Sequence, residues 1–399
     1  MKKLILTVGL TTTLFLGLSR CDTTNPEPMS ITINETYRQQ SGDFAFSFLK
    51  ELEKEEVGKN FFVSPLSLHM ALGMLLNGAD GVSKDELMEV LKLKGLDQET
   101  INTTYAELIE KLPEVDPKVT NTLANSIWQR EGFPVEQSFK DVLAESFKAD
   151  LYVEPFNTVT LDKINQWASD NTNAKIKKIL NEISADQVMF LINALYFKGD
   201  WAIEFDKNKT QKADFNGLDN VAQVDMMANT DTFAFVNMGG YKALDMEYGR
   251  GNYAMRVLLP ENGDAVSLLN ALTAKEWQSI TNKQSVTKVD LRFPKLKMEY
   301  EKELNDVLVN MGVPSIFSGN ADLSKISPPA GKIVVGFVKQ NAFVEIDEKG
   351  TEAAAVTTIG IELTSVPQYT TFHVNKPFLF FIYEKTSGTI QFAGKILNF

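Results

Sequence analysis

The sequence predicts an α+β fold with large, mostly antiparallel β-sheets. Segments with helical apolar spacing lie mainly in the first half of the 399-residue chain, and strand-like apolar segments dominate the second half. This order of elements is typical of α+β folds. The chain has no internal repeat, and with 44% apolar residues it can bury a substantial core, so its length fits one large domain or two ordinary ones.

The first half of the chain carries the helical patterns. Residues 43–55 place apolar side chains on one side and Lys and Glu on the other, which predicts an amphipathic helix. Residues 60–81 predict a short strand and then a nearly all-apolar, buried helix, for which Ser64 before Pro65 is a suitable N-cap. The remaining predictions for this half are a short helix at 82–93, a strand at 119–130 and a helix at 161–180.

The second half is predicted to consist mainly of strands. Residues 188–201 are too apolar for an edge strand, so this strand is expected at the centre of a covered sheet. One helix, at 300–312, is expected to interrupt the later strands. These strands are predicted at 234–238, 241–248, 253–260, 286–296, 341–348 and 371–397.

Composition argues against several function classes. A net charge of −12 without a basic block argues against nucleic acid as a partner and against a heparin-type site. The single cysteine, Cys21, allows no intramolecular disulfide, and with His69 and His373 it cannot form a usual four-ligand zinc site. A hydrolase triad would have to use one of these histidines, yet His69 is expected in the core or on a helix face and no G-x-S-x-G occurs. No enzyme activity and no cofactor are therefore predicted.

The N-terminus resembles an export signal. Residues 1–20 contain two lysines, then a short apolar stretch, then small residues, and the apolar run is too short to span a bilayer. Cys21 and a flexible tether over 21–36 follow, as in bacterial lipoproteins, although Arg20 stands where a small residue is expected. We therefore expect Cys21 to be lipidated and to hold the protein at the bacterial cell envelope or surface, with simple secretion as the alternative.

Several ordered motifs carry a family resemblance. They include "NFFVSPLSLHMALGMLLNGA", "INALYFKGDW", "MGVPSIFSGNADLSKI", "DEKGTEAAA" and "NKPFLFFI". Over residues 37–399 the chain resembles the serpin family. The resemblance implies a single, monomeric domain with three β-sheets, eight or nine helices and an exposed reactive-centre loop. It also implies suicide inhibition of serine proteases, and sometimes of cysteine proteases, without a catalytic residue in the inhibitor itself.

The segment near residues 350–363 has the period-2 pattern of a strand with one buried face. One alternating set is uncharged and becomes more apolar along the chain, whereas both glutamates fall in the other set. Such alternation has no use in an exposed loop, so we expect the segment to become a strand. By resemblance, this happens when the cleaved loop inserts into the large sheet. The uncharged set is Thr351, Ala353, Ala355, Thr357, Ile359, Ile361 and Leu363.

The expected energetics favour insertion. About a dozen residues that gain ladder hydrogen bonds would release on the order of 10–20 kcal/mol, and burial of the apolar side chains would add ~5 kcal/mol. Since an ordinary fold is stable by only ~5–15 kcal/mol, the uncleaved state would be a kinetic trap. By resemblance, the hinge is of the inhibitory type, although a non-inhibitory serpin or a surface binding lipoprotein stays the alternative. The hinge residues are Gly350, Thr351, Glu352, Ala353, Ala354, Ala355 and Val356.

Family spacing from Glu348 places the scissile bond between Thr364 and Ser365. Because the following segment is about two residues longer than is common in the family, the bond after Leu363 is the rival; cleavage after Val366 is disfavoured by the next residue, Pro367. The small and aliphatic residues here predict elastase-, subtilisin- or chymotrypsin-like targets rather than trypsin-like ones.

The resemblance also implies two regions that control insertion. At the breach, where insertion begins, it implies an ion pair between Lys295 and Glu348, close to Trp201. Lower in the sheet, at the shutter, Gln340 stands where the family usually has histidine. The implied shutter residues are Ser64, Ser67, Asn193 and Gln340.

Overall fold

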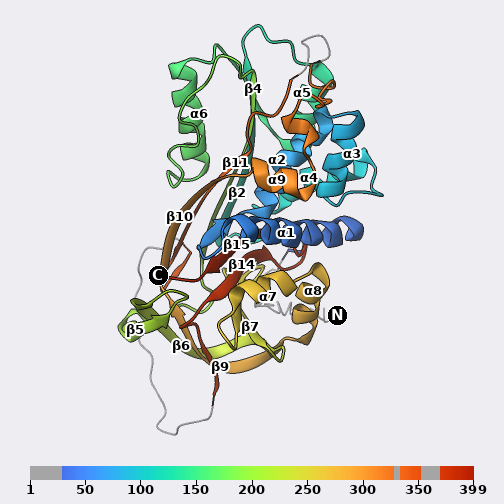
Figure 1. Cartoon of the computed structure of the whole chain (residues 1–399). Helices are drawn as coiled ribbons and strands as arrows, with labels where there is room; N and C mark the ends of the chain where they lie inside the picture. Colours follow the sequence, from blue (N-terminus) through green and yellow to red (C-terminus); the bar gives the residue numbers. More distant parts are fainter. Residues whose placement is uncertain (1–28, 328–332, 352–368) are drawn as a thin grey trace, which may run out of the picture.

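The computed structural model describes residues 29–327, 333–351 and 369–399 (Figure 1). This part of the chain contains nine α-helices and two β-sheets, which confirms the α+β prediction. None of its helices is both long enough and apolar enough to cross a bilayer. The helices are α1 (Glu35–Glu55), α2 (Pro65–Gly78), α3 (Gly81–Val90), α4 (Gln98–Lys111), α5 (Gln137–Phe147), α6 (Thr158–Asn171), α7 (Ala265–Ala271), α8 (Ala274–Lys283) and α9 (Asn305–Met311).

The six-stranded sheet has the order β10-β11-β12-β4-β2-β3. Its strand β4 pairs with β2 on one side and with the two-residue β12 on the other, so the prediction of a central strand near residues 188–201 is confirmed. The sheet is antiparallel except between β2 and β3. Its strands are β2 (Val119–Arg130), β3 (Asp150–Glu154), β4 (Met189–Asp200), β10 (Leu296–Glu303), β11 (Lys339–Ile346) and β12 (Gly350–Thr351).

The other sheet has nine strands in the order β1-β15-β14-β8-β7-β6-β9-β13, with β5 paired to β6. A separate third sheet, which the resemblance implies, is not confirmed among the described strands. The reason is that the 17-residue β6 pairs with β5 and β9 and then, near its end, with β7. The strands are β1 (Phe61–Val63), β5 (Gln211–Asn216), β6 (Val221–Asn237), β7 (Tyr241–Tyr248), β8 (Tyr253–Pro260), β9 (Ser285–Pro294), β13 (Thr370–His373), β14 (Phe378–Glu384) and β15 (Ile390–Ile396).

Helix α2 shows how the local sequence builds the core. Ser64 caps it by accepting a hydrogen bond from the backbone N–H of Ser67 at 3.0 Å, and Pro65 occupies the first helical position. Most of its side chains are buried, as the nearly all-apolar sequence predicts. A second, smaller core lies between α6 and the strands β2 and β4, where Trp167 and Ile164 pack with Trp128 and Phe190.

Some element predictions are wrong. The helix expected over 161–180 ends at Asn171, because Asn173 and Ala174 adopt left-handed backbone conformations. The helix expected from residue 300 begins at Asn305, because the preceding residues pair with β11 as part of β10. Helices α4, α5, α7 and α8 were not predicted from the sequence pattern.

Candidate functional site

The start of the hinge is a strand of the six-stranded sheet. Gly350 pairs with Asp200 of β4, and Thr351 pairs with Gly199 of β4 and Ile346 of β11. A Cβ at Gly350 would overlap the carbonyl oxygen of Gly199 and lie 2.7 Å from the Cα of Asp200, so only glycine fits this approach of two backbones. The other hinge and reactive-bond residues lie outside the described residues; they are Glu352, Ala353, Ala354, Ala355, Val356, Leu363, Thr364 and Ser365.

Thr351 is anchored inside the molecule. The residue is 4% exposed, and its Oγ1 lies 2.7 Å from Tyr248 Oη in a hydrogen bond. The tyrosine belongs to β7 of the other sheet, so this contact joins the hinge to the core beneath it. Burial raises the pKa of the Tyr248 phenol, which keeps the hydroxyl protonated.

An ion pair closes the breach beside the hinge. Lys295 Nζ lies 2.9 Å from Glu348 Oε2, and Thr210 Oγ1 donates to Glu348 Oε1 at 2.8 Å. Burial raises the pKa of the Glu348 carboxyl, but the hydrogen bonds from Lys295 and Thr210 outweigh it, so the pKa lies below its ordinary value. For Lys295, burial lowers the pKa, but the hydrogen bond to Glu348 and the nearby carboxylate charges together raise it by more. Both shifts favour the charged pair.

Trp201 packs against the same turn. Its ring stacks on Tyr248 at 4.4 Å, and its Nε1 donates to the carbonyl oxygen of Asp347 at 3.0 Å. The backbone N–H of Trp201 also donates to Lys349 O at 2.7 Å. The structure therefore brings the three predicted breach residues together around the turn that leads into β12.

A seam separates β4 from β11 below Thr351, that is, over the residues that precede Gly199 in β4 and Ile346 in β11. Among the described strands no ladder joins these two, so each has pairing groups directed at the other across the seam. A cavity of about 20 Å³ lies in the seam, with room for about one water molecule. Its lining is Thr172, Lys175, Ile176, Leu195, Tyr196, Phe197, Phe343, Glu345, Thr351 and Phe392.

Three of the four predicted shutter residues form one cluster. The side chain of Gln340 accepts from the backbone N–H of Ser64 at 2.9 Å and donates to the Ser64 carbonyl at 2.8 Å. Ser64 Oγ in turn accepts from Ser67. Asn193 is not part of this cluster: its Nδ2 donates to Asn125 Oδ1 at 2.8 Å, and its Oδ1 is buried without a hydrogen-bond partner in the described part of the chain.

Sequence reasoning missed three residues of the site. Tyr248, Thr210 and Asn125 contact Thr351, Glu348 and Asn193 respectively. Tyr248 and Thr210 come from another sheet and a connecting loop, and their local sequence carries no signal of this role. Asn125 lies directly opposite Asn193 in the ladder between β2 and β4, so the strand register would have identified it.

The two histidines have structural partners. His69 is buried in α2, where its Nδ1 lies 2.8 Å from Tyr105 Oη and its Nε2 lies 3.2 Å from Leu91 O. Burial lowers the pKa of His69 to about 4, so this side chain is neutral at pH 7. His373 Nε2 lies 2.8 Å from Asp290 Oδ2. Within the described ranges no group of three or more His, Cys, Asp and Glu side chains could hold a metal ion, and Cys21 lies outside them.

This fold and site define a two-sheet protein in which no ladder besides the two residues of β12 joins β4 to β11 among the described strands. A family model described as serpin (serine protease inhibitor) matches residues 39–399. Iripin-1 of Ixodes ricinus is 33% identical over 353 residues, which cover 85% of this chain and 88% of that protein.

Solved structures agree. The native state of tengpin, a thermophilic serpin, gives a TM-score of 0.85 at 29% identity and covers 93% of this chain and 96% of its own. Human thyroxine-binding globulin gives a TM-score of 0.81 at 25% identity over 91% of this chain and 98% of its own. The chain belongs to the serpin family, whose members are mostly protease inhibitors and not catalytic enzymes.

Proposed function

We propose that this chain is a suicide inhibitor of serine proteases with elastase-, subtilisin- or chymotrypsin-like specificity, with cysteine proteases as further targets. The observation that carries the proposal is the position of Thr351. It is already a strand residue between β4 and β11, and below it these strands share no ladder among the described residues. A strand that continued from Thr351 would satisfy the pairing groups on both sides of the seam.

The inhibitor supplies a substrate and a conformational change. The protease serine attacks the carbonyl carbon of Thr364, the bond to Ser365 breaks, and an acyl-enzyme forms. The freed loop then inserts below Thr351, and the attached protease is carried away from its productive geometry before water can release it. The breach and the shutter hold the seam until that moment, because Glu348 and Gln340 join β11 and its turn to other elements.

The test is incubation with pancreatic elastase or with subtilisin. A covalent complex that survives denaturant is the expected result, and the mass of the released C-terminal peptide identifies the scissile bond. Complete cleavage without a complex would reject inhibition and favour a non-inhibitory serpin.

Thr351→Arg is the variant that separates cleavage from trapping. Its guanidinium would have to be buried beside Tyr248, so the hinge would stay out of the sheet and the protein would become a substrate. Trapping that persists in this variant would contradict the proposed path of insertion.

We also propose that residues 1–20 direct export and that Cys21 carries a lipid anchor, with secretion as the alternative. Cys21→Ser would then release the protein from the membrane fraction, whereas an unchanged distribution would reject the anchor.

A further inference from the structure

Three buried polar side chains meet where the two sheets pack on each other. Asn121 comes from β2 of the six-stranded sheet, whereas Tyr253 of β8 and Gln391 of β15 come from the nine-stranded sheet. Asn121 is 3% exposed, and the other two residues are fully buried. Asn121 Nδ2 donates to Tyr253 Oη at 2.8 Å. Burial raises the pKa of the Tyr253 phenol, and the amides of Asn121 and Gln391 lower it, so both amides lie close to this hydroxyl.

Gln391 is the extra residue of a β-bulge. Along the ladder between β14 and β15, Ile382 pairs with Phe392 and the next residue, Tyr383, pairs with Ile390, so Gln391 has no partner in β14. Neither Oε1 nor Nε2 of its side chain has a hydrogen-bond partner in the described part of the chain. No other described residue leaves two buried side-chain atoms in this condition. Because an unbonded buried amide is costly, a further group must bind it.

The hydrogen bonds of Tyr253 fix the orientation of the Asn121 amide. The phenol donates its proton to Leu112 O, so toward Asn121 it can only accept. The NH₂ group of Asn121 must therefore point at the phenol. This orientation leaves Asn121 Oδ1 buried without a partner among the described residues.

The unpartnered atoms define the chemistry of the group that binds them. Gln391 Nε2 requires an acceptor, whereas Gln391 Oε1 and Asn121 Oδ1 require donors. A metal ion or an ammonium ion cannot accept from Nε2, and a simple anion cannot donate to the two oxygens. Water both donates and accepts, and buried waters bind polar groups of this kind. The buried carboxylate of Glu384 is not the missing acceptor, because its oxygens accept from Thr386 and Ser387.

We propose that Gln391 and Asn121 bind an internal water molecule that joins the two sheets. The water accepts a hydrogen bond from Gln391 Nε2 and donates its two protons to Gln391 Oε1 and Asn121 Oδ1. One molecule therefore satisfies all three atoms.

The water site lies behind the hinge. Tyr253 pairs with Tyr248, which forms the hydrogen bond to Thr351. The Phe197 ring of β4 lies 5.0 Å from the Tyr248 ring and 5.4 Å from the Tyr253 ring. The water thus ties β2 to the layer of β7 and β8 that anchors Thr351. This inference does not depend on protease inhibition, because it concerns the intact protein alone.

The experiment is a high-resolution crystal structure of the intact protein, with melting temperatures of the wild type and Gln391→Leu. We expect a water peak within hydrogen-bond distance of Gln391 Nε2 and Asn121 Oδ1 in the wild type. Gln391→Leu should lose this peak and melt about 1–3 °C lower, because Asn121 Oδ1 is then left without a donor. Gln129→Leu is the control, since it removes another buried amide from β2 and should leave the peak in place.

Three results would overturn the water site. The first is a wild-type map without a peak at these atoms. The second is a Gln391→Leu protein that melts above the wild type, because removal of two truly unbonded groups would stabilise the fold. The third is loss of the peak in Gln129→Leu as well, which would show that the water does not depend on Gln391 and Asn121 specifically.

Discussion

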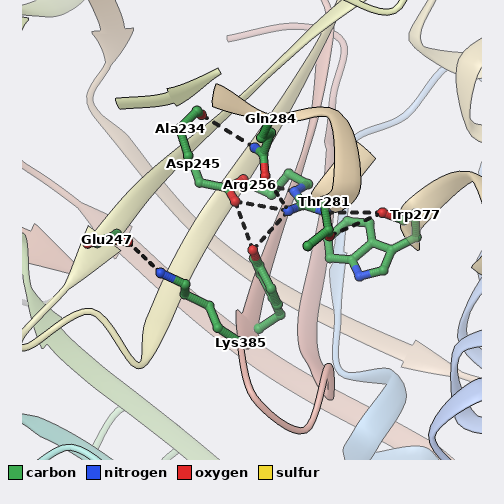
Figure 2. A network of polar contacts seen from close by, with 9 residues as sticks. Ala234, Asp245, Glu247, Arg256, Trp277, Thr281, Gln284 and Lys385 are labelled. Carbon is green, nitrogen blue, oxygen red and sulfur yellow. Dashed lines mark hydrogen bonds and ion pairs between the residues drawn. The ribbon is translucent and has the colours of Figure 1, made fainter. Parts of the chain in front are cut away.

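The seam between β4 and β11 contrasts with the interior of the nine-stranded sheet. Figure 2 shows Arg256 of β8 at the centre of a buried network. Its guanidinium binds both carboxylate oxygens of Asp245 at 2.8 and 2.9 Å and also Tyr383 Oη at 2.9 Å. The Trp277 ring covers the guanidinium at 4.3 Å. Strands β7, β8 and β14 that carry this network are paired along their length.

The two regions contain similar residue types but differ in how completely their polar groups and strands are paired. Both combine buried polar groups with aromatic rings, but the network around Arg256 has a partner for each charge and strands paired on both sides. In β4, one polar atom of Asn193 has no described partner, and within the described residues no ladder besides the two residues of β12 joins β4 to β11. A fully paired region resists change, whereas a region with unsatisfied pairing groups can gain free energy by accepting a strand.

The largest loss of stability is expected from a substitution in the buried network around Arg256. Asp245→Asn leaves a buried guanidinium without a countercharge, so we expect the free energy of unfolding to fall by about 3–5 kcal/mol. Urea unfolding of the variant and the wild type measures this loss of free energy. Glu247→Gln on the same strand is the control, because its partner Lys385 is exposed, and it should cost less than about 1 kcal/mol. Equal losses in the two variants would contradict the contrast.

A smaller loss of stability is expected from a substitution at the hinge, where β12 pairs with β4. Gly350→Ala forces β12 away from Gly199, so we expect a loss of about 1–3 kcal/mol and faster amide exchange in the last residues of β4. Gly240→Ala is the matched control, since a Cβ there meets nothing within 4 Å. If both variants exchange alike, the hinge is not held in the sheet as described.

The smallest effect concerns the breach and its pH dependence. Because the folded pKa of Glu348 is lowered, its pair with Lys295 stabilises the fold above the ordinary carboxyl pKa, and this contribution is lost as the pH falls through the lowered pKa. In Lys295→Met the cation is gone and burial raises the carboxyl pKa, so protonation of Glu348 at low pH relieves the cost of a buried charge and the difference from the wild type shrinks as the pH falls. We expect the free energy of unfolding of Lys295→Met to be about 1 kcal/mol lower than that of the wild type at pH 7, because Lys295 is 38% exposed. Unfolding curves that shift equally at every pH would refute this assignment.

Much of the site was accessible from sequence because it is local or carried by motifs. The hinge pattern and Gln340 could be located from the sequence alone. The role of Tyr248 could not, since this residue reaches Thr351 through the packing of two sheets. Residues 172–176 were predicted as helix because the apolar spacing continues past Asn171, whereas local hydrogen bonds hold a left-handed backbone at Ala174 that ends the helix.

The most direct test is a crystal structure of the protein after cleavage by subtilisin. We predict a new strand that continues from Thr351 between β4 and β11 and pairs with both. A cleaved molecule in which β4 and β11 keep the present seam, with no strand between them below Thr351, would contradict the account.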